Sequence, residues 1–143
     1  MYFYQKITIF VVLKLKNMHY LKDYPISWAV IISIFVVCLI PTPETPVNGV
    51  PGIDKLVHTA LYAFLCSVIL FERFRHRSLK TADMKRCFVG AFVLPIAMSG
   101  LIELLQAYAT TCRSGDWWDM AANSLGIVLS WIAFILLKRR IAK

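Results

Sequence analysis

Four long apolar runs dominate the sequence, at about 24–40, 54–71, 87–108 and 119–137. The hydrophobic content of 59% is too high for a soluble domain of 143 residues. A helix needs about 20 apolar residues to cross a bilayer, and a helix satisfies its own backbone hydrogen bonds there. We therefore predict an all-α fold, a four-helix transmembrane bundle.

The basic residues alternate between the connections of these runs. Fourteen of the 16 Lys and Arg lie before the first run, between the second and third, or after the last; Lys55 and Arg113 are the other two. Because cytoplasmic loops carry the excess of Lys and Arg, both termini are predicted to be cytoplasmic. The net charge of +8 then reflects topology, and no nucleic-acid partner is expected.

Three segments follow from this layout. Residues 1–23 are predicted to form a cytoplasmic or interfacial segment, because the apolar stretch at 7–12 is too short to span a bilayer. A true start at Met18 is the alternative interpretation of this segment. Residues 24–137 form the transmembrane domain, and 138–143 form a basic cytoplasmic tail.

Polar side chains gather at the outer ends of three runs. An ionisable group inside a membrane costs a few kcal/mol, so it needs a partner or a function. The second and fourth runs enter the membrane on the side where the third leaves it, which places their polar residues at a similar depth. The set comprises Asp54, Lys55, His58, Glu103, Gln106, Arg113, Asp116, Asp119 and Asn123.

Some of these residues have a simple structural explanation. Asp54 and Asp116 stand at expected N-cap positions, and Asp119 stands in a first turn, where the helix dipole favours an anion. Trp117 and Trp118 fit the aromatic belt at the membrane surface.

For others, the charge opposes the helix dipole. Lys55 is a cation in a first turn, and Glu103 is an anion in the last turns of a helix. A buried carboxyl group pairs with a cation or becomes neutral. We therefore predict an ion pair of Glu103 with Lys55 or Arg113. His58 is expected to hydrogen-bond to Gln106 or to an acid.

Helix shape and packing are also predictable. Pro95 removes a backbone hydrogen bond inside the third run and should kink that helix, with another group satisfying the freed carbonyl. Such a kink would tilt the outer half, which carries Glu103, relative to the inner half. Ala122, Gly126 and Ser130 recur every four residues, a small-residue stripe that allows close approach of a second helix.

Other kinds of site are weighed against this one. A structural ion-pair network would explain the polar residues without any chemistry. Catalysis by Ser114 or Cys112 lacks an evident neighbouring base other than His58. The cysteines have no metal spacing and no two histidines lie close together, so no metal or other cofactor is expected. A metal site would have to combine His58 with Asp54, Glu103, Asp116 or Asp119.

Three stretches, DKLVH at 54–58, GLIELLQ at 100–106 and RSGDWWDMAAN at 113–123, resemble the VanZ-like family. The resemblance extends over about Trp28 to Leu136, and all nine polar positions match the family's motifs. It implies a small integral membrane protein. The namesake of the family is associated with low-level resistance to the glycopeptide teicoplanin.

Together these features predict a multi-pass protein of the bacterial cytoplasmic membrane. Its outward polar pocket would bind or modify an envelope lipid or a lipid-linked cell-wall precursor, with teicoplanin resistance as an associated role. Glu103 and His58 are the candidate catalytic residues, and the other seven polar residues would contact the ligand. The expected partners are membrane lipids, a wall precursor or a lipoglycopeptide. A non-catalytic scaffold and a metal-dependent membrane hydrolase are the alternatives, and the residues alone do not decide whether the protein is an enzyme.

Overall fold

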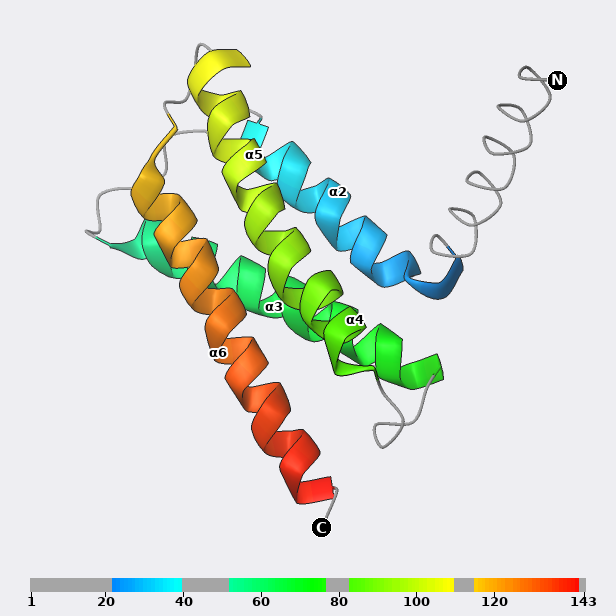
Figure 1. Ribbon diagram of the computed structural model, residues 1–143. Coiled ribbons are helices and arrows are strands. Elements are labelled where there is room, and N and C mark those ends of the chain that lie inside the picture. Colours follow the sequence, from blue (N-terminus) through cyan, green and yellow to red (C-terminus); the bar gives the residue numbers. More distant parts are fainter. Residues whose placement is uncertain (1–21, 40–51, 77–82, 110–114, 142–143) are drawn as a thin grey trace, which may run out of the picture.

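The computed structural model describes residues 22–39, 52–76, 83–109 and 115–141, and the regular elements of these ranges are all helices (Figure 1). The predicted all-α fold is confirmed for this part of the chain. The elements are α2 (Pro25–Leu39), α3 (Ile53–His76), α4 (Met84–Phe88), the π-helical turn η2 (Val89–Val93), α5 (Leu94–Ala109) and α6 (Trp117–Ile141). Because α4, η2 and α5 follow one another without a break, they form one rod, and the described chain has four rods.

Three of the four rods are long and apolar enough to cross a membrane. They are Ile53–Arg75 with 23 residues, Met84–Tyr108 with 25 and Trp117–Ile141 with 25. The fourth, α2, has 15 residues. At 1.5 Å per residue α2 is about 22 Å long, less than the roughly 30 Å of a hydrocarbon core. Residues 1–21 of the expected N-terminal segment, and Cys112, lie outside the described residues.

The connection between the second and third runs is shorter than predicted. The second and third apolar runs, at 54–71 and 87–108, leave 72–86 as their connection, but α3 continues to His76. Glu72 lies inside this extension and is buried, because it binds the beginning of α2. Asp83 then caps α4 by accepting hydrogen bonds from two backbone N–H groups of its first turn, at 3.1 and 3.4 Å.

Helices α3 and α6 pack closely along the predicted small-residue stripe. Thr59 donates from its hydroxyl to the carbonyl of Ala122 at 3.1 Å, and Ser130 donates to the carbonyl of Ala63 at 2.8 Å. Between these contacts, a Cβ atom on Gly126 would overlap the carbonyl oxygen of Thr59. The prediction of a close helix approach at this stripe is confirmed.

Proline interrupts the backbone hydrogen bonding of the third rod. Pro95 has no N–H for the carbonyl of Ala91, four residues earlier. The thiol of Cys66 donates to that carbonyl at 3.0 Å. The wide π turn at Val89–Val93 directly precedes the proline. A side chain of the neighbouring helix thus satisfies the freed backbone group, as expected for a proline in a membrane helix.

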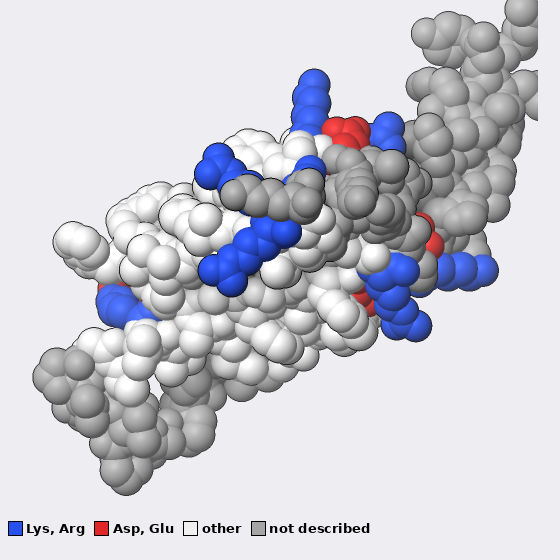
Figure 2. Space-filling model, turned by 90° about the horizontal axis from the view of Figure 1, so that it is seen from below, with Lys and Arg blue, Asp and Glu red and all other residues white. Residues whose placement is uncertain are grey.

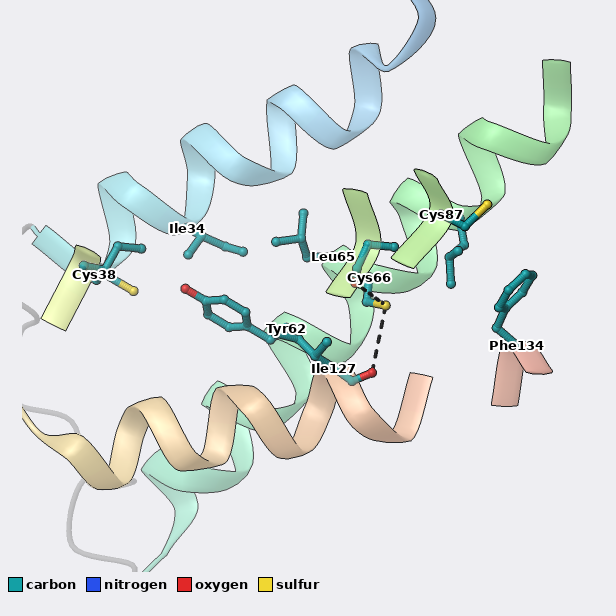
Figure 3. Packing of buried hydrophobic residues seen from close by; sticks show 11 residues of the cluster. Ile34, Cys38, Tyr62, Leu65, Cys66, Cys87, Ile127 and Phe134 are labelled. Carbon is teal, nitrogen blue, oxygen red and sulfur yellow. Dashed lines mark hydrogen bonds between the residues drawn. The ribbon is translucent and has the colours of Figure 1, made fainter. Parts of the chain in front are cut away.

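The hydrophobic core lies where all four rods meet (Figure 3). Leu65 and Ile127 are fully buried at its centre, and the ring of Tyr62 extends from α3 toward Ile34 of α2. The core ends at Phe134, which stacks on Phe74 with ring centroids 5.2 Å apart. The core therefore joins α2, the shortest rod, to the three longer ones.

Charged residues separate to the two ends of the bundle. We call the end where α3 and α6 begin and α5 finishes the polar end, and the opposite end the basic end (Figure 1). Of the nine Lys and Arg in the described part, only Lys55 lies at the polar end. Seen from below, most of the visible surface is uncharged, and Lys and Arg form separate projecting groups (Figure 2). The eight at the basic end are Lys22, Arg73, Arg75, Lys85, Arg86, Lys138, Arg139 and Arg140.

Candidate functional site

Lys55 joins the beginning of α3 to the beginning of α6. Its ammonium nitrogen lies 2.7 Å from Asp116 Oδ2 and 3.4 Å from Asp54 Oδ2, and it also contacts Asp119 Oδ1. Three carboxylates therefore surround one cation at the polar end. This arrangement offsets the unfavourable position of a cation in a first turn.

The aspartates also organise the first turns of their helices. Asp116 is the N-cap of α6, because its Oδ1 accepts from the N–H of Trp118 at 2.9 Å. The Lys55 ammonium, followed by this N–H, holds the pKa of the Asp116 carboxyl below its ordinary value. Asp119 lies in the first turn of α6, as predicted. Asp54 was expected to be an N-cap but lies inside the first turn of α3, which begins at Ile53.

Glu103 is buried, with 3% of its surface exposed. Its Oε2 accepts from the backbone N–H of Asp116 at 2.8 Å, while its Oε1 has no hydrogen-bond partner among the described residues. Gly115 permits this contact, because a Cβ there would overlap the carbonyl oxygen of Glu103. The predicted ion pair with Lys55 is wrong, since Lys55 binds the aspartates instead. Arg113, the other predicted partner, lies outside the described residues.

His58 follows Lys55 by about one turn of α3, and its side chain is buried. Its Nδ1 is 3.1 Å from Asn123 Oδ1, and Asn123 Nδ2 donates to Ser99 Oγ at 2.8 Å. On the other side of the ring, Nε2 lies 3.5 Å from Asp119 Oδ2 and 3.7 Å from Asp54 Oδ1. The hydrogen bond of His58 is therefore to Asn123, and the two acids lie only within ion-pair distance of the ring, so the expected hydrogen bond to Gln106 or to an acid is not found among the described residues.

Gln106 does not contact His58 through any hydrogen bond that the structure describes. Its amide donates to the carbonyl of Cys38 at 2.8 Å, in the last turn of α2. Carbonyls in a last turn have no partner within their own helix, so this bond holds the end of α2 against α5. Gln106 therefore has a structural contact in addition to its predicted role in ligand binding.

The three sequence motifs thus meet at one end of the bundle, as predicted. Eight of the nine predicted residues are in the described part of the chain, and all eight lie at the polar end. A family model described as VanZ/LLP1 matches residues 2–138.

The chain belongs to the VanZ/LLP1 family. The match confirms the resemblance drawn from the motifs and extends beyond the Trp28–Leu136 range that they cover. Comparison with curated proteins and with solved structures found no match.

Three buried polar residues of this VanZ/LLP1 chain were not expected from the sequence: Ser27, Glu72 and Ser99. Ser99 supports Asn123 and stands one helical turn before Glu103, a spacing that could have identified it. Glu72 is the only acidic residue between Asp54 and Asp83, and it stands at the end of an apolar run. An isolated acid in such a position is a usable signal for a buried partner.

One hollow in the described part of the structure lies away from the site. It is at the basic end and, within the described residues, one helix lines it, so it is a depression in the surface of α6. A polar pocket at the polar end stays a prediction. The lining residues of the hollow are Ala133, Leu136, Leu137, Arg139 and Arg140.

Proposed function

We propose that the polar end binds or modifies an envelope lipid, or a lipid-linked precursor of the cell wall, on the outer side of the bacterial cytoplasmic membrane. The membrane helices and the family membership support a protein that acts in the lipid phase. Glu103 is the central ligand-contacting or acid–base group in this proposal, and His58 is its neighbour on α3.

The observation that carries the proposal is the free oxygen of Glu103. A buried polar atom without a partner costs roughly 1–3 kcal/mol, and nearly all such atoms in folded proteins are satisfied. Glu103 Oε1 has no partner in the described part of the chain although the side chain is 3% exposed. A ligand hydroxyl, amine or phosphate proton would satisfy it.

The contacts of Lys55 refine the expected role of this residue. A contact between Lys55 and an anionic headgroup was expected, but three aspartates already surround its ammonium group. Its role in this proposal is to hold α3 and α6 together at the binding site. Arg113, three residues before Asp116 in the chain, is the remaining candidate for a direct contact with the headgroup.

The test is the substitution Glu103→Gln in a teicoplanin-susceptible bacterial host. Glutamine keeps the shape of the side chain and an oxygen for the Asp116 N–H, but it removes the charge and the acid–base function. We expect the wild-type protein to raise the inhibitory concentration of teicoplanin and to change the lipid profile measured by mass spectrometry. The Glu103→Gln protein, at equal membrane abundance, should match the empty vector.

Asp83→Asn is the matched control, because it neutralises an exposed carboxylate at the basic end. This variant should behave like the wild type in both measurements. A Glu103→Gln protein that retains the full wild-type effect would refute the proposal.

A scaffold is the second candidate function, and the Lys55 network supports it. The contacts of Lys55 with aspartates on both helices explain several polar residues by packing alone. A scaffold would tolerate Glu103→Gln and would lose its effect when Gly126 is enlarged at the α3–α6 contact. The pair of variants therefore distinguishes the two functions.

A further inference from the structure

Two aspartates at the polar end divide their oxygens between two neighbours. Asp119 uses Oδ1 and Asp54 uses Oδ2 to contact Lys55. Each presents its other oxygen, Asp119 Oδ2 and Asp54 Oδ1, to Nε2 of His58. These three inner atoms lie within 4.8 Å of one another. They come from the first two turns of α3 and the first turn of α6, so the fold brings them together.

The hydrogen bonds on the Nδ1 side of His58, made by Asn123 and Ser99, set which ring nitrogen carries a proton. Asn123 donates its amide to Ser99, so its oxygen faces the ring and accepts from Nδ1–H at 3.1 Å. Neutral imidazole then has its lone pair on Nε2, which faces the two carboxylate oxygens. The distances of 3.5 and 3.7 Å exceed the 3.2 Å limit of a good N–H···O bond.

A lone pair and two anionic oxygens that converge in this way repel one another unless a positive charge lies between them. His58 is 5% exposed, so bulk water screens this repulsion poorly. The two distances from Nε2, 3.5 and 3.7 Å, are close to those between ligands of one metal ion: zinc ligands lie about 2.0–2.1 Å from the ion, so tetrahedral ligands are about 3.4 Å apart. A metal-bound histidine also typically donates its other N–H to an oxygen, as His58 does to Asn123.

We propose that Asp54, His58 and Asp119 bind a divalent transition-metal ion, with zinc as the best match to this nitrogen-plus-carboxylate set. Lys55 would then orient the two carboxylates. It contacts Asp54 Oδ2 and Asp119 Oδ1, which leaves the other oxygen of each carboxylate directed at the ion. Asn123 and Ser99 orient the imidazole. Three protein ligands leave at least one coordination position open.

The metal would also change what the polar end can bind. Four carboxylates lie there in the described part of the chain, against the single ammonium group of Lys55, so a bound cation would make this part of the site more attractive to an anion. A divalent ion with an open position attracts a phosphate group, which lipid headgroups and lipid-linked precursors carry. This consequence rests on the proposed function, whereas metal binding itself does not. The carboxylates are those of Asp54, Glu103, Asp116 and Asp119.

The experiment measures metal directly on the full chain in detergent. Purified protein is stripped with a chelator, dialysed against Zn²⁺ or Mn²⁺, and analysed for metal per chain. We expect one zinc ion per wild-type chain and at least about tenfold weaker binding in His58→Gln and Asp119→Asn. Asn123→Ala, which removes only the support of the ring, should weaken binding by about 10–100-fold.

Asp54→Asn protects the test against misfolding, because the Asp54 side chain is 58% exposed and its loss leaves the buried contacts intact. It should also weaken zinc binding, while Asp83→Asn should bind zinc like the wild type. Wild-type protein without stoichiometric zinc or manganese, or equal binding in every variant, overturns the proposal.

Failure of this proposal is distinguishable from failure of the lipid function. Absence of metal together with a null phenotype for Glu103→Gln removes the metal site alone. One zinc ion per chain together with a fully active Glu103→Gln protein removes the lipid function alone.

Discussion

At the scale of single residues, Glu72 shows how a buried carboxylate can serve structure alone. It is 1% exposed, and its two oxygens accept the backbone N–H groups of Ile26 and Ser27, both at 2.8 Å. The hydroxyl of Ser27 adds a third bond at 2.6 Å. These N–H groups begin α2 and lack partners within it, and the helix dipole there favours an anion. One side chain of α3 thus caps a neighbouring helix.

We therefore expect Glu72→Gln to destabilise the protein by roughly 1–3 kcal/mol, because one glutamine oxygen cannot replace two anionic acceptors and its amide would face N–H donors. Thermal unfolding in detergent measures this loss. Ser27→Ala removes one of the three bonds and should cost less. An unchanged melting temperature for Glu72→Gln would contradict the capping role.

At the scale of elements, the contact between α3 and α6 determines the geometry of the site. Gly126 lies against the backbone of Thr59 and Ala63, so the two helices cross with no side chain between them. This crossing sets the distance between the turns that carry His58 and Asp119. The packing of a glycine thus controls a polar contact two turns away.

Gly126→Ala should force α3 and α6 apart and destabilise the protein by about 1–3 kcal/mol, the usual cost of overpacking. Gly90→Ala is the matched control, because a Cβ at Gly90 meets no atom within 4 Å. Melting temperatures in detergent compare the two variants. Equal melting temperatures would mean that α3 and α6 do not depend on this close contact.

At the scale of the whole molecule, the two ends differ in charge, and we propose that this difference orients the protein. Eight of nine described Lys and Arg lie at the basic end, which is the end that the positive-inside rule places in the cytoplasm. The polar end would then face outward. This orientation places the carboxylate cluster on the side where cell-wall precursors are used.

Labelling of Cys112 tests the orientation, since its position in the sequence lies between α5 and α6. The other cysteines, Cys38, Cys66 and Cys87, are at most 3% exposed and should not react. We expect a membrane-impermeant maleimide to label Cys112 in intact cells. A protein with Cys112→Ser and Ser78→Cys should be labelled only after the membrane is permeabilised. The opposite pattern would place the polar end in the cytoplasm.

Sequence alone determined the helices, their polar ends and the meeting of the three motifs. These features depend on the hydropathy and charge of each stretch, which can be summed from the sequence without knowledge of tertiary contacts. They also depend on the alternating direction of successive spans. The freed carbonyl before Pro95 and the small-residue stripe at Gly126 follow equally from local chemistry, whereas the π turn was seen only in the structure.

Only the tertiary structure decided which polar groups pair. Lys55 binds the aspartates instead of Glu103, Gln106 holds the end of α2, and Glu72 caps its beginning. These choices depend on how far each helix is rotated about its axis and how closely the axes approach. Rotation and approach result from packing across the whole core, and no single stretch of the sequence contains that information.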